Sequence, residues 1–252
     1  MTDTISMQPK FSIITVTFNA GKVLEDTIMS VIAQTYKGIE YIIVDGGSKD
    51  NTLDIVNKYK EHIDQAISEP DKGLYDAMNK GIRMATGDYL CFLNAGDKLH
   101  DCNTLLQIVE TLKDKELPDV IYGETAIVDE SGNFLHMRRL STPEQLTWKS
   151  FKQGMLVCHQ AFLAKRELAL KEPYDLQYRF SADFDWCIRI MKKAKCLHNT
   201  RLILIDYLNE GMTTRNHKAS LKERFRIMVK HYGWISTVLH HCWFAIRLFY
   251  KP

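Results

Sequence analysis

The sequence lacks the features of several large classes of protein. None of its six cysteines forms a C-x-x-C pair, so we expect no zinc site and interpret them as free thiols in a reducing compartment. The chain has no basic segment followed by an apolar one at its start, and no apolar run of about 18 residues, so we expect neither a signal peptide nor a membrane span. The net charge of +2 argues against a nucleic-acid-binding protein that relies on bulk charge.

The first hundred residues contain alternating strand and helix patterns. Runs of β-branched and aromatic residues predict strands, and apolar residues at helical spacing predict helices. We expect these elements at 11–18 (strand), 23–32 (helix), 41–44 (strand), 53–59 (helix), 65–68 (strand), 74–85 (helix), 89–93 (strand) and 102–113 (helix). Such alternation builds a parallel sheet with right-handed crossovers. The absence of G-x-G-x-x-G after the first strand excludes a dinucleotide fingerprint.

The pattern changes after Pro118. Residues 120–128 and 134–138 flank a turn and predict a hairpin. The remaining elements are expected at 143–149 (helix), 183–193 (helix), 202–205 (strand) and from 217 onward (helices, broken near 233). We therefore predict an α/β fold in one compact domain, with a helical C-terminal extension.

The stretch from Gly87 to Asp97 is central to the expected site. Its apolar run is bounded by turn residues and predicts a strand buried on both faces, which ends in the sequence N-A-G-D. Ligands bind at the carboxyl ends of strands in open α/β sheets, so Asp97 is placed to hold a metal ion or a ligand. The alternative is an ordinary turn, since Asn, Gly and Asp are all turn residues.

Four stretches together resemble glycosyltransferase family 2, the GT-A-fold nucleotide-sugar transferases. They cover residues 11–36, 39–52, 68–81 and 87–97, and a weaker likeness, S-A-D-F-D-W at 181–186 with Arg189, extends the match towards residue 215. The resemblance implies a Rossmann-like mixed sheet of GT-A type for residues 1–214. Within it, residues 1–100 are expected to bind the nucleotide sugar and residues 101–214 the acceptor, and residues 215–252 form the extension.

The resemblance implies a nucleotide-sugar site at the ends of the first two strands. Asp45 at this position can accept a hydrogen bond from uracil N3–H or from ribose hydroxyls, and Thr17 and Asn19 lie at the end of the first strand. Asp71 is implied to lie beside the nucleotide as well. The alternatives are that Asp45 only shapes a tight turn, and that Asp71 caps the helix that begins at Leu74.

For the diphosphate, the family usually carries a D-x-D motif that holds Mn²⁺ or Mg²⁺ together with the substrate phosphates. Here only Asp97 remains as the expected metal ligand, and Asn94 is expected to contact the cation or the donor sugar. Arg215 and His217 follow a loop that contains Gly211, and a solvated loop is the default interpretation there. The alternative is that both close on the diphosphate, and Arg215 is the candidate contact that we carry forward.

For the acceptor, Asp183 matches the catalytic Asp of the family. A carboxylate within reach of the acceptor hydroxyl takes its proton as the oxygen attacks C1, which inverts the anomeric carbon. Asp185 is the rival base. Residues two positions apart on a helix do not face the same way, so only one of the two aspartates should point into the site. If Asp183 is the base, Asp185 is expected on the acceptor side. His159 is expected on the acceptor side. The alternative is that both aspartates only interact favourably with the helix dipole.

The C-terminal stretch is basic. Residues 215–252 contain eight Lys/Arg and one Glu, a local net charge of +7 that leaves −5 for the rest. Lys218, Lys222 and Arg224 alternate with apolar residues, and Trp234 and Trp243 follow. This pattern suits interfacial helices on an anionic membrane surface. Packing on the catalytic domain, or on a second subunit in a homodimer, is the alternative.

We therefore predict an inverting, metal-assisted hexosyltransferase that uses a UDP-linked nucleotide-sugar donor. Its acceptor is expected to be a glycan or a polyprenyl-linked glycan in exopolysaccharide synthesis. We expect it in the cytoplasm, peripheral to the cytoplasmic face of the inner membrane. The rivals are a nucleotidyltransferase on a similar sheet, and a catalytically inactive partner in a polysaccharide assembly complex, which the reduced N-A-G-D motif keeps open.

Overall fold

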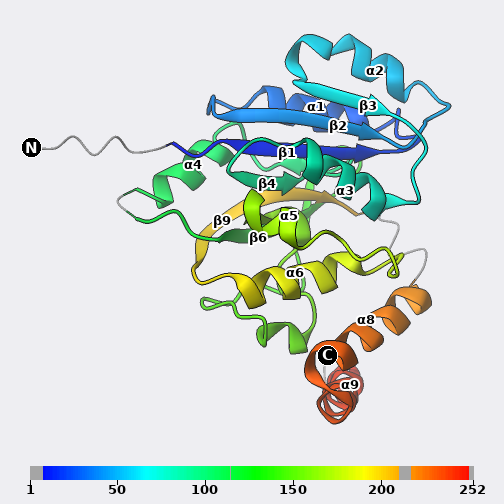
Figure 1. Ribbon diagram of the computed structural model, residues 1–252, viewed down its shortest axis with the longest axis vertical. Helices are drawn as coiled ribbons and strands as arrows, with labels where there is room; N and C mark the ends of the chain where they lie inside the picture. Colours follow the sequence, from blue (N-terminus) through cyan, green and yellow to red (C-terminus); the bar gives the residue numbers. More distant parts are fainter. Residues whose placement is uncertain (1–7, 114, 210–216, 250–252) are drawn as a thin grey trace, which may run out of the picture.

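The protein forms one nine-stranded mixed sheet with helices on both faces (Figure 1). The computed structural model describes residues 8–113, 115–209 and 217–249. The strands are β1 (Phe11–Thr17), β2 (Ile39–Asp45), β3 (Gln65–Ser68), β4 (Tyr89–Phe92), β5 (Lys98–Leu99), β6 (Val120–Val128), β7 (Phe134–Met137), β8 (Phe162–Lys165) and β9 (Leu197–Leu208). The helices are α1 (Leu24–Ile32), α2 (Thr52–Lys58), α3 (Leu74–Met84), α4 (Thr104–Thr111), α5 (Arg166–Lys171), α6 (Ala182–Lys193), α8 (His217–Tyr232) and α9 (Trp234–Phe249).

The sheet consists of a parallel half and a mixed half. Its order is β3-β2-β1-β4-β8-β6-β9-β5, with β7 paired to β6. The first four strands are parallel, β8 is antiparallel to both β4 and β6, and β9 is parallel to β6. The carboxyl ends of β1, β2, β3 and β4 therefore meet at one edge, which is where ligands bind in open α/β sheets.

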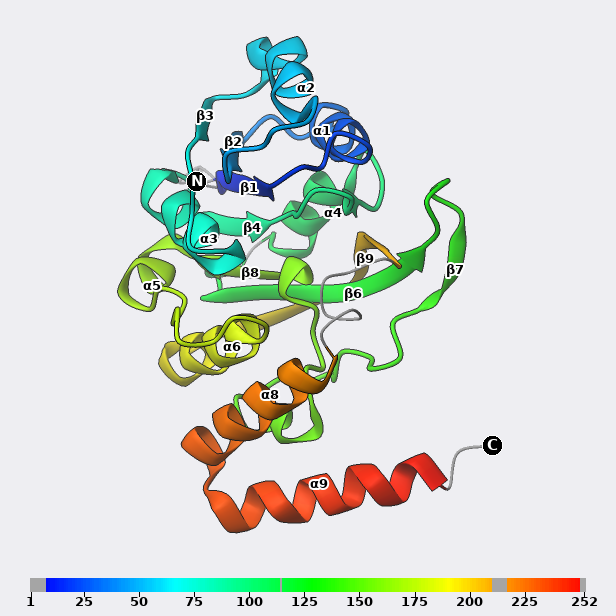
Figure 2. The ribbon, with the colours of Figure 1, turned by 90° about the vertical axis from the view of Figure 1, so that its right-hand side faces the viewer.

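The central strands explain where the core lies. Every residue of β1 and β4 is buried, because helices cover both faces of this part of the sheet. In Figure 2, α1 and α2 lie on one side of the parallel strands, and α3, α5 and α6 lie on the other. Strands buried on both faces have continuous apolar runs, as β4 does.

Most of the predicted elements are confirmed, with ends that shift by one or two residues. The hairpin of β6 and β7 is also confirmed, and β9 is longer than the predicted strand. The helix predicted at 143–149 is wrong. There the hydroxyl of Tyr122 donates to the carbonyls of Pro143 and Glu144 and accepts from the amide of Leu146, so these backbone groups bond to a side chain instead of to a helix.

The two C-terminal helices are confirmed, with Gly233 between them. Gly233 has φ +81°, a left-handed conformation that favours glycine at a helix end. Figures 1 and 2 show α8 beside α6, and α9 at the end of the molecule opposite α2. Within the described ranges, no helix has the length and apolarity needed to cross a bilayer.

Candidate functional site

The ends of the parallel strands bring three polar residues into one row. Thr17 pairs with Asp45 in the register of β1 and β2, and Asp45 pairs with Ser68 in the register of β2 and β3. All three lie at the carboxyl edge of the sheet, as the sequence predicts for Thr17 and Asp45. The hydroxyl oxygen of Thr17 is buried and has no hydrogen-bond partner among the described residues.

The side chain of Asp45 points back into the turn that follows β2. Its Oδ2 accepts from the amides of Gly47 (3.0 Å) and Ser48 (2.9 Å) and from the hydroxyl of Ser68 (2.6 Å), and its Oδ1 accepts from the hydroxyl of Ser48. Asn19 supports the same turn, because its Oδ1 accepts from the amide of Lys49 (2.8 Å). Asp45 and Asn19 thus fix the shape of this edge. The contacts of Asp45 are those expected of a residue that shapes a tight turn.

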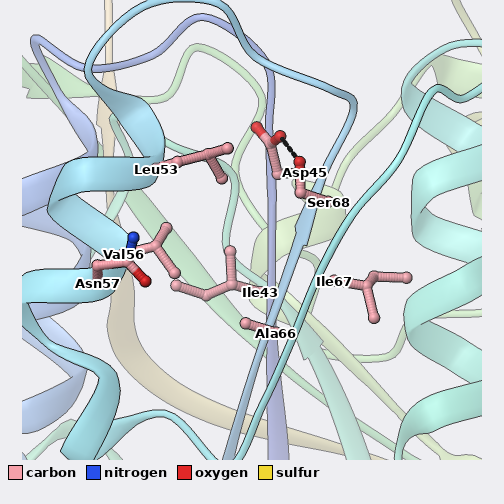
Figure 3. Close-up of a pocket in the computed structure, with 8 residues that line it drawn as sticks. All are labelled: Ile43, Asp45, Leu53, Val56, Asn57, Ala66, Ile67 and Ser68. Carbon is pink, nitrogen blue, oxygen red and sulfur yellow. Dashed lines mark hydrogen bonds between the residues drawn. The ribbon is translucent and has the colours of Figure 1, made fainter.

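A cavity of about 230 Å³ lies below this turn, between α2 and the strands β2 and β3 (Figure 3). Asp45 and Ser68 stand at one end of it, joined by their hydrogen bond. Its other walls are aliphatic, apart from the amide of Asn57. None of the described residues that line it is a cation, so we do not assign the cavity to the diphosphate.

Phe18, Gly46 and Asp71 make a second group at the same edge. Phe18 follows β1 directly and its side chain is 62% exposed. A Cβ on Gly46 would lie 2.5 Å from Oδ2 of Asp71 and 3.4 Å from the ring of Phe18, so glycine lets both side chains approach this turn. The other oxygen of Asp71 accepts from the amide of Gly73 (2.7 Å), at the start of α3. Phe18 was not among the site residues expected from the sequence, although an aromatic residue directly after a predicted buried strand is a usable signal.

Asn94 and Asp97 lie beyond β4, as predicted. The Asp97 carboxylate is buried and accepts from Nε2 of Gln160 (2.7 Å) and from the amide of Leu208 (3.1 Å). Burial raises the pKa of this carboxyl to about 7, although both hydrogen bonds act against the rise. The amide oxygen of Asn94 is buried without a partner among the described residues.

Asp183 lies in the first turn of α6 and contacts two other elements. Its Oδ1 accepts a hydrogen bond from the hydroxyl of Tyr75 on α3 (3.0 Å), and its Oδ2 lies 3.6 Å from Nδ1 of His159. Burial lowers the pKa of His159, and the charge of Arg138 acts in the same direction, while Asp183 opposes it. His159 is therefore neutral near pH 7, and its Nε2 is buried with no partner among the described residues.

His159 and Gln160 connect the two carboxylates. They are consecutive residues of one short 3₁₀ turn (His159–Ala161), and they contact Asp183 and Asp97 respectively. The charges of both aspartates also raise the pKa of Cys158, next to His159, although burial is the larger cause. The predicted base, the predicted metal ligand and the predicted acceptor-side histidine therefore share one neighbourhood.

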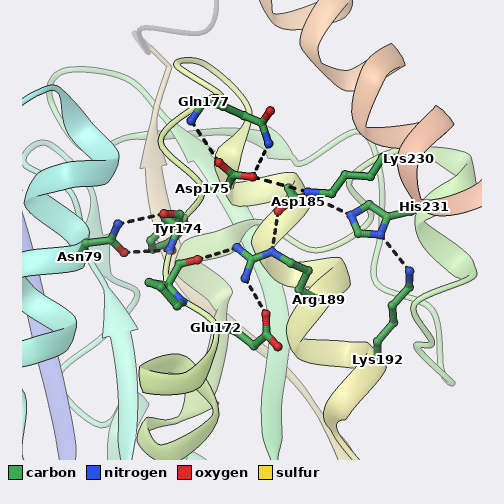
Figure 4. A network of polar contacts seen from close by, with 11 residues as sticks. Asn79, Glu172, Tyr174, Asp175, Gln177, Asp185, Arg189, Lys192, Lys230 and His231 are labelled. Carbon is green, nitrogen blue, oxygen red and sulfur yellow. Dashed lines mark hydrogen bonds and ion pairs between the residues drawn. The ribbon is translucent and has the colours of Figure 1, made fainter.

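Asp185 has a different environment, shown in Figure 4. Its side chain is fully buried, and it accepts from Nε of Arg189 (2.6 Å), Nε2 of His231 (2.7 Å) and Nζ of Lys230 (3.2 Å). Burial opposes ionisation here, but the hydrogen bonds from His231 and Arg189 outweigh it and hold the pKa of Asp185 well below its usual range. The structure does not bring Asp185 together with the row of residues at the sheet edge. Arg215 and the side chain of His217 lie outside the described residues.

A metal site is assembled only in part by the described residues. They contain no group of three or more His, Cys, Asp or Glu side chains arranged to hold a cation. One buried carboxylate and one unpartnered amide oxygen, those of Asp97 and Asn94, do follow the same strand. Mg²⁺ is commonly bound by one or two protein oxygens together with substrate phosphates, so this donor set fits such an ion.

The fold is of the GT-A type. The S. aureus TarS fragment 1–349 in complex with UDP-GlcNAc has the same fold, with a TM-score of 0.72 and 18% identity over 87% of this chain and 64% of that chain. The mannosyltransferase PcManGT from Pyrobaculum calidifontis, in complex with GDP-Man and Mn²⁺, has a TM-score of 0.64 and 15% identity over 95% of this chain and 76% of that chain.

The chain belongs to glycosyl transferase family 2, whose model matches residues 12–172. It is 37% identical over 206 residues to the PGL/p-HBAD biosynthesis glycosyltransferase of Mycobacterium tuberculosis, covering 80% of this chain and 77% of that protein. It is 29% identical over 195 residues to the amylovoran biosynthesis glycosyltransferase AmsB of Erwinia amylovora, covering 72% of this chain and 64% of that protein. It is therefore a glycosyltransferase of the type found in polysaccharide and glycolipid biosynthesis.

Proposed function

We propose that this glycosyltransferase moves a sugar from a UDP-linked donor to a hydroxyl of a glycan or polyprenyl-linked glycan, with inversion at the anomeric carbon. The observation that carries the proposal is the His159–Gln160 pair. These two residues contact the carboxylate expected to act as base, Asp183, and the carboxylate expected at the diphosphate, Asp97. A reaction that deprotonates one substrate and releases a diphosphate from the other needs both groups side by side.

Asp183 is the proposed base. The acceptor oxygen attacks C1 of the donor sugar, the bond from C1 to the diphosphate oxygen breaks, and the acceptor proton passes to Asp183. The hydrogen bond from Tyr75 fixes one carboxylate oxygen, which leaves the other for the acceptor. The bare Nε2 of neutral His159 is a hydrogen-bond acceptor, suited to a second hydroxyl of the acceptor sugar.

The donor base is proposed to lie over the turn that Asp45 and Asn19 shape. The exposed ring of Phe18 offers a stacking surface, and the carboxylate of Asp71 offers an acceptor for uracil N3–H. The unpartnered hydroxyl of Thr17 is a further contact for the nucleotide. TarS, which shares the fold, is solved in complex with UDP, and this supports a uridine donor.

Asp97 and Asn94 would hold Mn²⁺ or Mg²⁺ together with the donor phosphates. When bound, the cation neutralises charge that develops on the leaving diphosphate. The Asp97 carboxylate is buried, and burial disfavours its ionised form, so a cation bound beside it would favour ionisation. Arg215 remains a proposed second source of positive charge for the same diphosphate.

The C-terminal helices are proposed to bind an anionic membrane surface at the cytoplasmic face, where a polyprenyl-linked acceptor would be met. On α9, an outward row of apolar side chains is exposed, and it consists of Ile235, Leu239, Trp243 and Ile246. The single acidic residue of α8 and α9, Glu223, is turned inward, where it accepts from the amides of Arg179 and Phe180. An apolar row without facing acidic groups complements anionic lipid.

Three lysines extend this surface beyond the C-terminal helices. Trp148 and Tyr232 stack at 5.5 Å next to the start of α9. Lys149 and Lys192 lie over the ring of Trp148, and Lys152 lies over the ring of Tyr232. Aromatic rings with lysines beside them are suited to the headgroup region of a bilayer.

Vesicle binding tests the membrane proposal. At low salt, Leu239→Glu should abolish sedimentation with phosphatidylglycerol vesicles, because it places a charge in the apolar row. Ala219→Glu, an exposed position on α8, adds the same charge outside the row and should bind nearly as wild type does. Wild-type protein that fails to bind these vesicles would refute the proposal.

Calorimetric titration tests the proposed reaction at its first step. Wild type and Asp97→Ala are titrated with UDP, GDP and their sugar conjugates, with and without Mn²⁺. We expect binding of UDP-linked donors that depends on Mn²⁺ and is lost in Asp97→Ala. Binding that needs no metal would move leaving-group stabilisation to cationic side chains such as Arg215. No binding of any nucleotide would favour an inactive partner in an assembly complex.

A further inference from the structure

The face of α8 that packs on the domain is hydrogen-bonded to the start of α6, the helix that carries Asp183. The hydroxyl of Ser220 hydrogen-bonds the hydroxyl of Ser181 (3.0 Å), which immediately precedes α6, and both serines are buried. One turn further along α8, Glu223 accepts from the amides of Arg179 (2.9 Å) and Phe180 (2.8 Å). The extension therefore packs directly against the chain that leads into the proposed base.

Arg224 lies on this same face. Residues 220, 224, 227 and 231 follow helical spacing, and the other three are buried against the domain or, in the case of His231, bonded to Asp185. Arg224 is half-buried, and its Nε is fully buried with no hydrogen-bond partner among the described residues. A buried N–H without a partner is unfavourable, so an arginine in this state is a candidate to bind a ligand.

The charge of Arg224 reaches the proposed active site. Burial and the neighbouring Asp183 raise the pKa of the Tyr75 hydroxyl, and the charge of Arg224 acts in the opposite direction. Tyr75 donates to Asp183, and α8 contacts Phe180 and Ser181, which precede Asp183 by three and two residues, so Arg224 belongs to the helix that packs next to the base. From the sequence, Arg224 was expected among the basic residues that contact the membrane. In the structure it lies on the side of α8 that faces the domain.

We propose that Arg224 binds a phosphate group of a substrate beside Asp183, and that α8 thereby completes the active site. This inference rests on the proposed function, since it adds a contact to the same site. A guanidinium carries several N–H donors in a planar fork that matches phosphate oxygens, and it stays charged at all working pH values. The phosphate belongs either to the nucleotide diphosphate of the donor or to the diphosphate of a polyprenyl-linked acceptor.

The test compares Arg224→Met with Arg226→Met, which removes a guanidinium from the exposed side of the same helix. Each full-length variant is titrated calorimetrically with three probes: UDP, uridine and farnesyl diphosphate, all in Mg²⁺. In Arg224→Met, one diphosphate should bind roughly ten- to a hundredfold more weakly, as expected for a charge-assisted hydrogen bond. Uridine binding and the thermal midpoint should equal those of wild type. Arg224→Lys should restore part of the affinity.

The outcomes separate the sources and the two proposals. Weaker binding of UDP alone supports the donor diphosphate as the ligand, and weaker binding of farnesyl diphosphate alone supports the acceptor. If Arg224→Met binds both diphosphates as tightly as Arg226→Met does, the role of Arg224 is refuted while the proposed function stands. An equal loss for uridine, or a lowered thermal midpoint, would refute it too, because the residue would then be structural. Wild type that binds neither diphosphate would overturn the proposed function as well.

Discussion

Asp183 and Asp185 are two residues apart on α6, but they lie on different sides of this helix and differ in exposure and in hydrogen-bond partners. Asp183 faces the sheet edge and keeps 16% of its side chain exposed. Within the described part of the chain it accepts one side-chain hydrogen bond, from Tyr75, and His159 lies at 3.6 Å. Asp185 faces α8, is fully buried, and is bonded to Arg189, His231 and Lys230. A carboxylate that must exchange protons with a substrate needs access, whereas one that joins two helices needs fixed partners.

The largest expected effect is on the accessible side. Asp183→Asn removes the proposed base but keeps the volume and the contact with Tyr75, so turnover should fall by about 10²- to 10⁴-fold. Thermal unfolding should be nearly unchanged. The check is the rate of nucleoside diphosphate release with the donor identified by calorimetry. Full activity in Asp183→Asn would remove this residue from the mechanism.

Asp185→Asn should instead lower stability. It removes the charge of a fully buried carboxylate that pairs with Arg189, His231 and Lys230, and leaves Arg189 with Glu172 as its remaining acidic partner, so we expect a loss of about 3 kcal/mol in the free energy of unfolding. Because folding lowers the pKa of Asp185, its stabilisation is present above the ordinary carboxyl pKa of about 4 and is lost as pH falls below it. The difference between wild type and variant, measured by urea unfolding, should therefore shrink between pH 5 and pH 3.

Asp175→Asn is the matched control for that measurement. Asp175 also lies near Lys230, at 3.5 Å, but its side chain is 32% exposed. Its pairing is largely screened by solvent, so the free energy of unfolding should change by less than about 1 kcal/mol. Equal losses for both variants would contradict the contrast between the two aspartates.

Tyr75→Phe sharpens the comparison from the side of Asp183. It removes the hydrogen bond to Oδ1 but keeps the ring that stacks on Tyr174 at 5.4 Å. Turnover should fall about tenfold, because one hydrogen bond to a charged group is lost. Unchanged turnover would reduce Tyr75 to a packing residue.

The smallest effect is expected at the joint of α8 and α6. Ser220→Ala removes one buried hydrogen bond to Ser181, so the free energy of unfolding should drop by about 1 kcal/mol. Activity per folded molecule should stay within a factor of two or so of wild type, because Asp183 keeps its own partners. Chemical unfolding and initial rates measure the two quantities in the same preparation.

The parallel half of the fold was predictable because its signals are local. The apolar run of β4 and the turn residues that bound it mark a buried strand without reference to any other element. The helix expected at 143–149 failed because the backbone there bonds to Tyr122, more than twenty residues earlier in the chain. A pattern confined to one segment carries no information on such a partner.

The candidate site shows the same limit. The motifs at residues 94–97 and 181–186 pointed to Asp97 and Asp183, but their contacts come from far away in sequence. Tyr75 reaches Asp183 across 108 positions, and Gln160 reaches Asp97 across 63. The choice between Asp183 and Asp185 depends on His231 of α8, which contacts Asp185 because α8 packs on α6. Among these site residues, only Phe18 could have been identified from a local pattern, an aromatic residue directly after a buried strand.

The most direct test of the account is sugar transfer by wild type, Asp183→Asn and Asp185→Asn, measured side by side. The release of nucleoside diphosphate is followed with the bound donor and an acceptor extract, and each rate is divided by the folded fraction at the assay temperature. We predict a rate lowered by at least about 10²-fold for Asp183→Asn and close to wild type for Asp185→Asn. The reverse pattern, with Asp185→Asn inactive while folded and Asp183→Asn active, would contradict the assignment of the two sides of α6.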